Sequence, residues 1–272
     1  MQFSQLILSI ELENKISSLI HSTAIIAENV ELGINVKIGP FSIIEKDVKI
    51  GDNCIIGNNV TIACDTIIGE NCKIFHSSSI GEVPQDLKYE GEKTFTKIGD
   101  NTVIREFVTI NKGTSELGKT QIGSNVLLMA STHVAHDCLV EDNVIMSNLA
   151  TLGGHVKIGE WAILGGGVLV HQFTKIGEHS LIGGGFRAVQ DVPPFIIAAN
   201  HPLAYKGVNL VGLKRRGFSK QDRNLIKEVY KIFFRSGLNR NEATKKIELE
   251  FPKSKVTQRI LDFIKNSNRG II

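Results

Sequence analysis

Residues 32–57 read LGINVKIGPFSIIEKDVKIGDNCIIG, a stretch in which an aliphatic residue returns at every sixth position. The same period runs through the chain in three blocks, which together make twenty-four repeats. Neither a helix nor an alternating strand produces a rule of six. The repeated aliphatic positions are Ile26, Leu32, Ile38, Ile44, Ile50, Ile56, Ile62, Ile68, Ile74, Ile80, Ile98, Ile104, Ile110, Ile122, Leu128, Val134, Val140, Met146, Leu152, Ile158, Leu164, Val170, Ile176 and Ile182.

A six-residue repeat is too short to bury itself, so each one must form a side of a coil that stacks on the next coil. Three sides make a triangular coil of 18 residues, and the sequence therefore predicts a parallel β-helix. The aliphatic residue should point to the axis, and the Gly that often follows it should adopt positive φ at a corner. Cys54 and Cys72, one coil apart, should stack inside.

The period predicts three parts of the chain. Residues 1–20 are expected to hold a short capping helix, 21–194 the hexapeptide-repeat β-helix and 195–272 a C-terminal helical domain. After Val192-Pro193-Pro194 the spacing becomes helical and predicts helices near 207–216, 220–235, 241–251 and 255–266, with Ser219 as an N-cap. The period is interrupted at 82–97 and 111–121, and such insertions form outward loops where sites are often built.

The composition favours a cytoplasmic enzyme, since no apolar stretch approaches the roughly 18 residues of a membrane span. Cys54, Cys64, Cys72 and Cys138 form no CxxC pair, and we expect reduced packing residues. The net charge is +3, yet residues 203–272 carry 17 Lys and Arg against 6 Asp and Glu. The C-terminal part is therefore basic and the rest of the chain acidic.

Four of the eight histidines, His133, His136, His155 and His171, fall within little more than two coils. Stacked strands are about 4.8 Å apart, so residues separated by 18 positions become neighbours. This register places His136 next to Gly154 and Gly154 next to Gln172. It also places Asp137 next to His155. The sequence thus predicts one polar patch on the outer surface.

These residue types suit acyl transfer. A histidine can accept a proton from a hydroxyl at neutral pH, which makes His136 the candidate general base. Asp137 could orient its ring, and the N–H of Gly154 could stabilise an oxyanion. No Ser or Cys nucleophile is required, so we expect direct attack.

A zinc site is the alternative chemistry, because His133 and His136 fall at adjacent strand positions and His155 and His171 could complete a ligand set. Hexapeptide-repeat carbonic anhydrases bind zinc through histidines of neighbouring chains. We expect no metal here.

Several segments resemble the acyl-carrier-protein-dependent UDP-N-acetylglucosamine O-acyltransferases of lipid A biosynthesis. The resemblance covers about 21–270 and is carried by the segments Ile80-Gly81-Glu82, Gln85-Asp86-Leu87-Lys88-Tyr89, His133-Val134-Ala135-His136-Asp137-Cys138, Gly154-His155, Val170-His171-Gln172-Phe173, Gln190-Asp191-Val192-Pro193-Pro194 and Gly212-Leu213-Lys214-Arg215-Arg216-Gly217-Phe218.

The resemblance implies a left-handed β-helix, a homotrimer with sites between subunits, and transfer of an (R)-3-hydroxyacyl group from acyl carrier protein to the 3-hydroxyl of UDP-N-acetylglucosamine. It supports His136 as the base and Gly154 as the oxyanion donor. It implies no bound cofactor beyond the acyl-phosphopantetheine of the carrier. The residues it assigns to the substrate sites are Asp86, Lys88, His133, His155, His171, Gln172, Gly184, Asn209, Arg215 and Arg216.

Acyl carrier protein is acidic, so the basic C-terminal part could steer it to the site through Lys and Arg of 214–235. Many of these charges could instead only solvate helices. Three positions depart from the family pattern: Val211 where Glu is common, Phe186 where a small residue is usual, and Gly153 where Ala is frequent. Phe186 lies beside Gly184, where the family sets acyl length, and its ring could shorten the accepted chain.

Three rival functions remain at this point. The N-acyltransferase of the same pathway has an additional N-terminal uridine-binding domain, whereas only about 25 residues precede the repeats here. An acceptor with a 3-amino group would give an amide product. A solenoid without activity would lack the base and the arginine pair.

Overall fold

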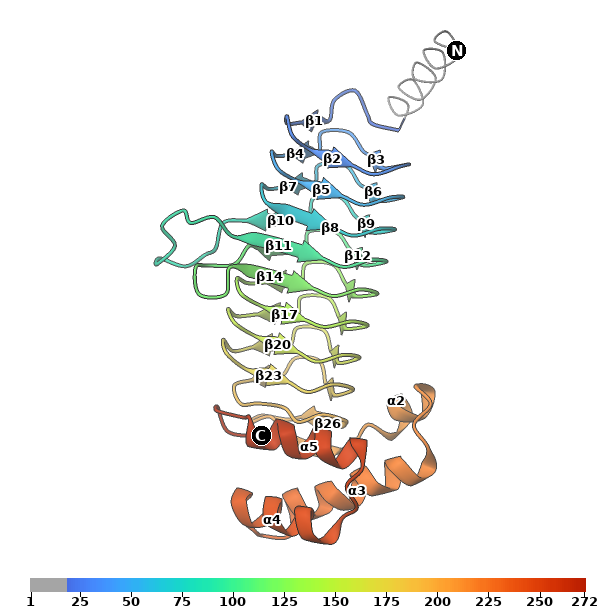
Figure 1. The fold of residues 1–272 in the computed structure, drawn as a ribbon, viewed down its shortest axis with the longest axis vertical. Helices are drawn as coiled ribbons and strands as arrows, with labels where there is room; N and C mark the ends of the chain where they lie inside the picture. Colours follow the sequence, from blue (N-terminus) through green and yellow to red (C-terminus); the bar gives the residue numbers. More distant parts are fainter. Residues whose placement is uncertain (1–18) are drawn as a thin grey trace. The chain divides into compact units, whose positions relative to one another are not determined.

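The structure, a computed structural model, describes residues 19–272, which fall into two compact units, the first ending at Leu139 and the second comprising Val140–Ile272. Nearly all of the predicted capping helix over 1–20 lies outside the described residues. The fold is a β-helix of hexapeptide repeats followed by C-terminal helices, as the period predicted (Figure 1). No described helix is long and apolar enough to cross a membrane.

In the first unit the chain passes in turn through three stacks of short parallel strands (Figure 1). One stack is β1 (Ile25–Ile26), β4 (Ile43–Ile44), β7 (Thr61–Ile62), β10 (Ser79–Glu82), β13 (Thr109–Asn111) and β16 (His133–Val134). The second is β2 (Glu31–Leu32), β5 (Lys49–Ile50), β8 (Thr66–Ile68), β11 (Phe95–Ile98) and β14 (Lys119–Ile122). The third is β3 (Lys37–Ile38), β6 (Ile55–Ile56), β9 (Lys73–Ile74), β12 (Val103–Ile104) and β15 (Leu127–Leu128).

The second unit repeats the pattern, and β17 (Leu139–Val140) lies at the division. Its stacks are β19 (Thr151–Leu152), β22 (Leu169–Val170) and β25 (Arg187–Ala188); β20 (Lys157–Ile158) and β23 (Lys175–Ile176); and β18 (Ile145–Met146), β21 (Ile163–Leu164), β24 (Leu181–Ile182) and β26 (Ile196–Ala199). A last strand, β27 (Ala204–Val208), pairs antiparallel with β26.

Burial confirms 22 of the 24 predicted inward positions, whereas Ile26 and Leu32 in the first coil are partly exposed. In β4, for example, Ile44 is fully buried while its neighbour Ile43 is 40% exposed. Ile44 pairs in register with Ile62, 18 residues later, so equivalent side chains stack along the axis. Cys54 and Cys72 are both fully buried, as expected, and none of the four cysteines, all of them in the described part of the chain, forms a disulfide.

The prediction that the Gly after the aliphatic residue adopts positive φ was wrong. Gly39, Gly51 and Gly57 do not adopt positive φ; the left-handed residues come two positions later, at Phe41 and Asn53 for example. A Cβ added at Gly39 would lie 2.6 Å from the carbonyl oxygen of Gly57 in the next coil. These positions therefore exclude side chains because successive backbones approach too closely.

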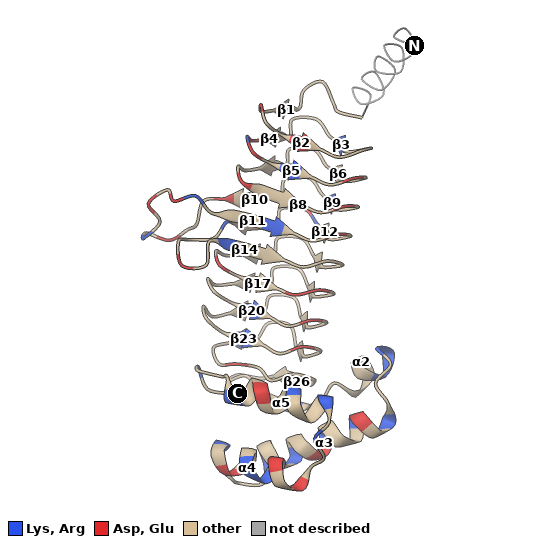
Figure 2. Cartoon of the chain, in the orientation of Figure 1, with Lys and Arg blue, Asp and Glu red and all other residues tan. Residues whose placement is uncertain are grey.

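Four helices complete the second unit: α2 (Leu210–Arg215), α3 (Lys220–Arg235), α4 (Arg240–Glu250) and α5 (Lys255–Lys265). Each begins after an Asn or Ser whose side chain accepts a backbone N–H of the first turn, and Ser219 caps α3 as expected. The helix expected from 207 is shorter because Ala204–Val208 forms β27. Figure 2 shows the Lys and Arg residues along α2 and α3.

The adjacent residues of β4 provide a test of this core. Ile44→Ala should lower the free energy of unfolding by about 2–5 kcal/mol, because it leaves a cavity that stacked coils cannot fill. Ile43→Ala, the matched control one residue away, should change it by less than about 1 kcal/mol. Urea unfolding followed by circular dichroism measures both. Equal effects would show that the inward and outward positions are wrongly assigned.

Candidate functional site

Asp137 anchors the candidate site in the first unit. It follows β16 with a φ of 59°, and the residue is only 1% exposed. The carboxylate accepts the backbone N–H of Thr114 at 3.0 Å from Oδ1 and the Thr114 hydroxyl at 2.7 Å from Oδ2. Its own N–H donates to Oγ1 of Thr120 at 2.8 Å. The predicted loop 111–121 thus fixes the orientation of the Asp137 carboxylate.

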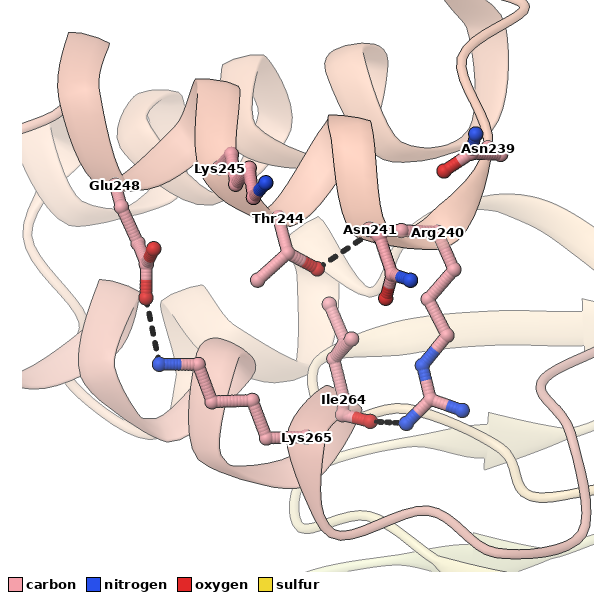
Figure 3. A pocket seen from close by; sticks show the side chains of 8 residues that line it. All are labelled: Asn239, Arg240, Asn241, Thr244, Lys245, Glu248, Ile264 and Lys265. Carbon is pink, nitrogen blue, oxygen red and sulfur yellow. Dashed lines mark hydrogen bonds and ion pairs between the residues drawn. The ribbon is translucent and has the colours of Figure 1, made fainter.

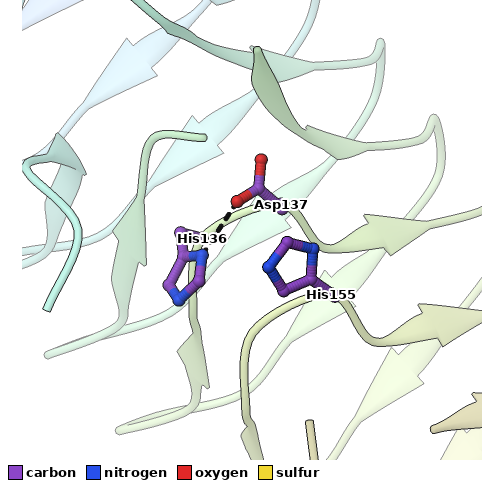
Figure 4. A group of neighbouring side chains, drawn as sticks. All are labelled: His136, Asp137 and His155. Carbon is purple, nitrogen blue, oxygen red and sulfur yellow. Dashed lines mark hydrogen bonds and ion pairs between the residues drawn. The ribbon is translucent and has the colours of Figure 1, made fainter. Parts of the chain in front are cut away.

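His136 is oriented by this buried carboxylate. Nδ1 of the ring lies 2.8 Å from Oδ2 of Asp137, a contact drawn in Figure 4. Because a carboxylate can only accept, Nδ1 carries the proton and donates, and Nε2 keeps its lone pair. His136 thus has the tautomer that a general base acting through Nε2 requires.

The loop that follows β10 reaches the same histidine. Oδ2 of Asp86 lies 3.9 Å from Nε2 of His136, so the structure brings these two predicted residues together. A tight turn holds Asp86, whose Oδ1 accepts the N–H of Lys88 at 3.0 Å. The Lys88 side chain is exposed. A negative charge near Nε2 would stabilise the ring after it accepts a proton.

His133, on the outer side of β16, is the second histidine of the first unit. Its Nδ1 lies 2.7 Å from the hydroxyl of Thr109. Burial, and then the nearby His136, lower the pKa of His133 below its ordinary value. His133 is therefore neutral at neutral pH and available as a hydrogen-bonding group.

Gly154, in the second unit, presents an uncommitted N–H. Its carbonyl oxygen accepts the N–H of Phe173, whereas its own N–H makes no hydrogen bond within residues 19–272. At the equivalent repeat positions of Glu70 and Glu160 the N–H is capped by a carboxylate, from Asp100 and Glu141 respectively. The N–H of Gly154 can therefore bind a substrate oxygen.

The register of 18 holds within the second unit around Gly154. Leu152 pairs with Val170, and the rings of His155 and Phe173 stack with centroids 4.5 Å apart. A Cβ at Gly153 would lie 2.8 Å from the N of Gln172. An Ala at this position would therefore require the backbone of the adjacent coil to move.

His171 and Gln172 follow β22, and both belong to the predicted patch. Nδ1 of His171 lies 3.2 Å from Nη2 of Arg269 and 3.2 Å from the carbonyl oxygen of Gln172. Arg269 was not predicted. It is 98 residues from His171 in the chain, and no motif pointed to it.

The arginine pair divides between two environments. Arg215 is exposed and lines a shallow hollow with Val211 and Lys214. Arg216 is half-buried, with its guanidinium 5.0 Å from the ring centroid of Trp161 and Nη1 3.4 Å from Nδ1 of His179. Arg216 therefore packs within the fold, whereas Arg215 faces solvent.

Two other predicted residues, Asn209 and Gly184, also have clear structural settings. Asn209 is buried; its amide donates to the carbonyl of His179 at 3.0 Å and accepts the N–H of Gly212 at 3.2 Å. Gly184 is exposed, and a Cβ there would lie 3.1 Å from the carbonyl oxygen of Gly166. The ring of Phe186 lies against Gly183.

The predicted site residues divide between the two units. His133, His136, Asp137, Asp86 and Lys88 belong to the first unit. Gly154, His155, His171, Gln172, Gly184, Asn209, Arg215 and Arg216 belong to the second. Within each unit the contacts are as described, and the single patch stays a prediction from the 18-residue spacing.

A metal ion fits this site poorly. His136 and Asp137 offer ligand atoms. The carboxylate, however, already accepts hydrogen bonds from Thr114 and from Nδ1 of His136, and a metal ion would have to displace them.

A separate hollow of about 770 Å³ lies between α4 and α5 (Figure 3). None of the predicted site residues lines it. Three of its four lining charges are engaged with one another or with the backbone: Lys265 pairs with Glu248, and Arg240 donates to the carbonyl of Ile264. It offers no group suited to acyl transfer.

Comparison with known proteins agrees with this geometry. The family described as UDP N-acetylglucosamine O-acyltransferase, domain 2, matches residues 191–272, and the bacterial transferase hexapeptide family matches 29–64 and 47–74. An acyl-[acyl-carrier-protein]–UDP-N-acetylglucosamine O-acyltransferase of Thiobacillus denitrificans is 51% identical over 254 residues, covering 93% of this chain and 98% of that protein.

Solved structures give the same result. The UDP-N-acetylglucosamine O-acyltransferase of Moraxella catarrhalis superposes with a TM-score of 0.91 at 40% identity, covering 93% of this chain and 99% of that one. The UDP-N-acetylglucosamine acyltransferase of Bacteroides fragilis gives a TM-score of 0.91 at 45% identity, with the same coverage.

His179, the buried neighbour of Arg216, provides a pH test. Burial, followed by the charges of Arg216 and Arg259, lowers the pKa of His179 from 6.5 to about 4. Between these values the unfolded chain binds the proton and the folded chain does not, so stability falls as the pH falls. The contribution of His179 should be complete above pH 6.5 and decline by about 2 kcal/mol by pH 5.

Urea unfolding at pH 7.5 and pH 5.0 measures this effect. His179→Gln should remove that part of the pH dependence, and the exposed His21→Gln should retain it. An unchanged dependence in His179→Gln would contradict the buried, neutral state of this ring.

Proposed function

The chain belongs to the family of acyl-[acyl-carrier-protein]–UDP-N-acetylglucosamine O-acyltransferases, and on that premise we propose that His136 is the general base of its reaction. The enzyme acylates UDP-N-acetylglucosamine, the first step of lipid A biosynthesis. The observation that carries the assignment is the 2.8 Å contact of His136 Nδ1 with Asp137, which leaves the lone pair on Nε2.

In the proposed reaction the 3-hydroxyl of the glucosamine attacks the thioester carbonyl of an (R)-3-hydroxyacyl group. The hydroxyl proton passes to Nε2 of His136 as the C–O bond forms. The C–S bond then breaks, and the phosphopantetheine thiolate leaves and takes the proton back from His136. Asp137 holds the ring, and the negative charge of Asp86 favours the protonated ring between the two steps.

The N–H of Gly154 is the proposed oxyanion donor. Its lack of an acceptor among residues 19–272 supports this role, because the donor needs no rearrangement when the oxyanion forms. The 18-residue spacing between His136 and Gly154 predicts that both groups reach the same carbonyl. His133, neutral and linked to Thr109, is a proposed hydrogen-bonding contact to the substrate.

The candidate nucleotide-binding residues differ in exposure and in their contacts with the fold. Arg215 is exposed and its planar guanidinium suits a diphosphate, so we propose it as the direct contact. Arg216 and Asn209, engaged within the fold, would shape the region around it. Val211 is 65% exposed near Arg215, and an aliphatic side chain there cannot make the hydrogen bonds of a glutamate.

The acyl chain is proposed to pass by Gly184, with Phe186 limiting its length. The ring of Phe186 lies against Gly183 and makes an edge contact with His201 at 5.1 Å between centroids. These contacts support a fixed position for the ring, and a fixed ring would favour a shorter acyl chain.

A homotrimer is the proposed assembly. Several outward side chains of the strands are apolar and exposed in the single chain: Ile25 is 63% exposed and Ile55 41% in the first unit, and Leu169 is 49% exposed in the second. Exposed apolar surface of this kind is expected at subunit contacts. Identical copies that cover it would support the family's arrangement.

Acyl carrier protein is the donor named for the family, and we propose that it docks on α3. Arg223, Lys227, Lys231 and Arg235 follow one another at intervals of four residues and therefore share one side of the helix. Lys227, Lys231 and Arg235 are exposed, and they line a hollow with Lys206. A positive stripe of this kind attracts an acidic carrier.

His136→Ala tests the base. The rate should fall by about 10²–10⁴, since a general base typically contributes that much. Purified protein is incubated with UDP-N-acetylglucosamine and (R)-3-hydroxyacyl carrier proteins of several chain lengths, and the acylated sugar is followed by mass spectrometry. His76→Ala, which removes a histidine of the first unit outside the site, should keep wild-type activity. Unchanged product with His136→Ala would reject the assignment.

Reversing two charges on α3 tests docking. Lys227→Glu with Lys231→Glu should raise KM for the acyl carrier protein about tenfold at low salt, because the stripe loses its attraction. KM for the nucleotide sugar should not change, and the effect should shrink at high salt. Lys253→Glu with Lys255→Glu makes the same charge change at the start of α5 and serves as the control. Equal effects from both pairs would show that only total charge matters.

A further inference from the structure

The end of the chain returns to the coils of the second unit. After α5, Ile271 bridges Asp191, and the N–H of Asp191 donates to the carbonyl of Gly270 at 2.9 Å. The N–H of Ile272 donates to the carbonyl of Asp191 at 3.2 Å. Asp191 is fully buried, and its Oδ1 accepts the N–H of Lys175 at 2.8 Å. The tail is thus held by its backbone against the segment that follows β25.

This attachment places Arg269 beside His171. Nη2 of Arg269 lies 3.2 Å from Nδ1 of His171. Its Nε is buried and has no hydrogen-bond partner among the described residues. The contact with His171 is therefore the side-chain hydrogen bond that this guanidinium makes among the described residues.

Nδ1 of His171 has two possible hydrogen-bond partners, Arg269 and the carbonyl oxygen of Gln172. Nδ1 also lies 3.2 Å from the carbonyl oxygen of Gln172. If Nδ1 carried the proton it could donate to that carbonyl, but it would then face a guanidinium that only donates and keeps its charge at any relevant pH. With a bare Nδ1 the ring accepts from Arg269 in a charge-assisted hydrogen bond. The second arrangement is favoured, and in it Nε2 carries the proton.

We propose that Arg269 is a positioning residue that holds His171 as the tautomer protonated on Nε2. His171 then presents an N–H to an oxygen of the bound substrate. This inference rests on the proposed function, since it takes His171 to be a substrate contact. The result is a division of labour between two histidines: Asp137 makes His136 a proton acceptor at Nε2, and Arg269 makes His171 a donor at Nε2.

The kinetic test compares Arg269→Met, Arg269→Lys, His171→Ala and the double variant Arg269→Met/His171→Ala. Arg269→Met should lower kcat/KM about tenfold, the effect of one lost hydrogen bond in the site. Arg269→Lys, which keeps a charged donor, should recover most of the loss. The double variant should be no worse than His171→Ala, because Arg269 acts through that ring. Arg259→Met, which removes an arginine that pairs with Glu178 instead, is the matched control and should keep wild-type activity.

A spectroscopic test follows the tautomer directly. In protein labelled with ¹⁵N-histidine, His171 should show a bare Nδ1 and a protonated Nε2, and Arg269→Met should shift it toward the other tautomer. The signal is assigned by its loss in His171→Ala. Thermal melting of each variant checks folding, which the backbone attachment at Asp191 should preserve.

The outcomes separate the two proposals. If His171→Ala has wild-type kinetics, the substrate role of His171 fails, and the tautomer measurement alone judges the contact with Arg269. If His171→Ala is impaired while Arg269→Met changes neither rate nor tautomer, the inference is overturned and the proposed function stands. Additive losses in the double variant would also overturn it, because Arg269 would then act independently of His171.

Discussion

The close approach of one coil to the next is the constraint from which the other features of this β-helix follow. Parallel pairing of residues 18 apart brings backbones so near that a Cβ at Gly39 or Gly51 would overlap the next coil. The same spacing forces one aliphatic side chain per side into a narrow axis. Corner residues such as Asn53 and Asn59 must then turn with left-handed φ. The aliphatic core, the left-handed corners and the glycine positions therefore all follow from the spacing between successive coils.

The chemistry depends on departures from this regular pattern. A regular coil ties up its backbone groups in pairing with the next coil, and its short strands carry few groups that could orient a catalytic side chain. The loop after β13 changes this by carrying Thr114 to the Asp137 carboxylate, which in turn orients His136. The loop after β10 brings Asp86 to the other side of the same ring. The regular coils therefore fix where His136 lies, and the two loops supply the groups that orient its ring and place a negative charge beside it.

Much of this could be predicted from sequence because the relevant distances are periodic. A period of six identifies the inward residues, and multiples of 18 identify neighbours, so Cys54 and Cys72 were placed together correctly. The role of the glycines was misjudged, since a sequence shows that a small residue is required without showing whether φ or crowding requires it. Contacts outside the period could not be predicted. Arg269 meets His171 across 98 residues, and Arg216 packs on Trp161, through tertiary folding that no spacing encodes.

The loops also show how such a chain can change over evolutionary time. Pairing distances are 18 residues in most of the first unit, but Thr66 pairs with Thr96 and Thr109 with His133, at separations of 30 and 24. The strand register resumes after each inserted loop, so the strands before and after the loop pair as they do elsewhere. Insertions and deletions in these segments are thereby decoupled from the solenoid's stability. A scaffold of this kind can therefore gain or lose residues in its loops while its architecture stays constant.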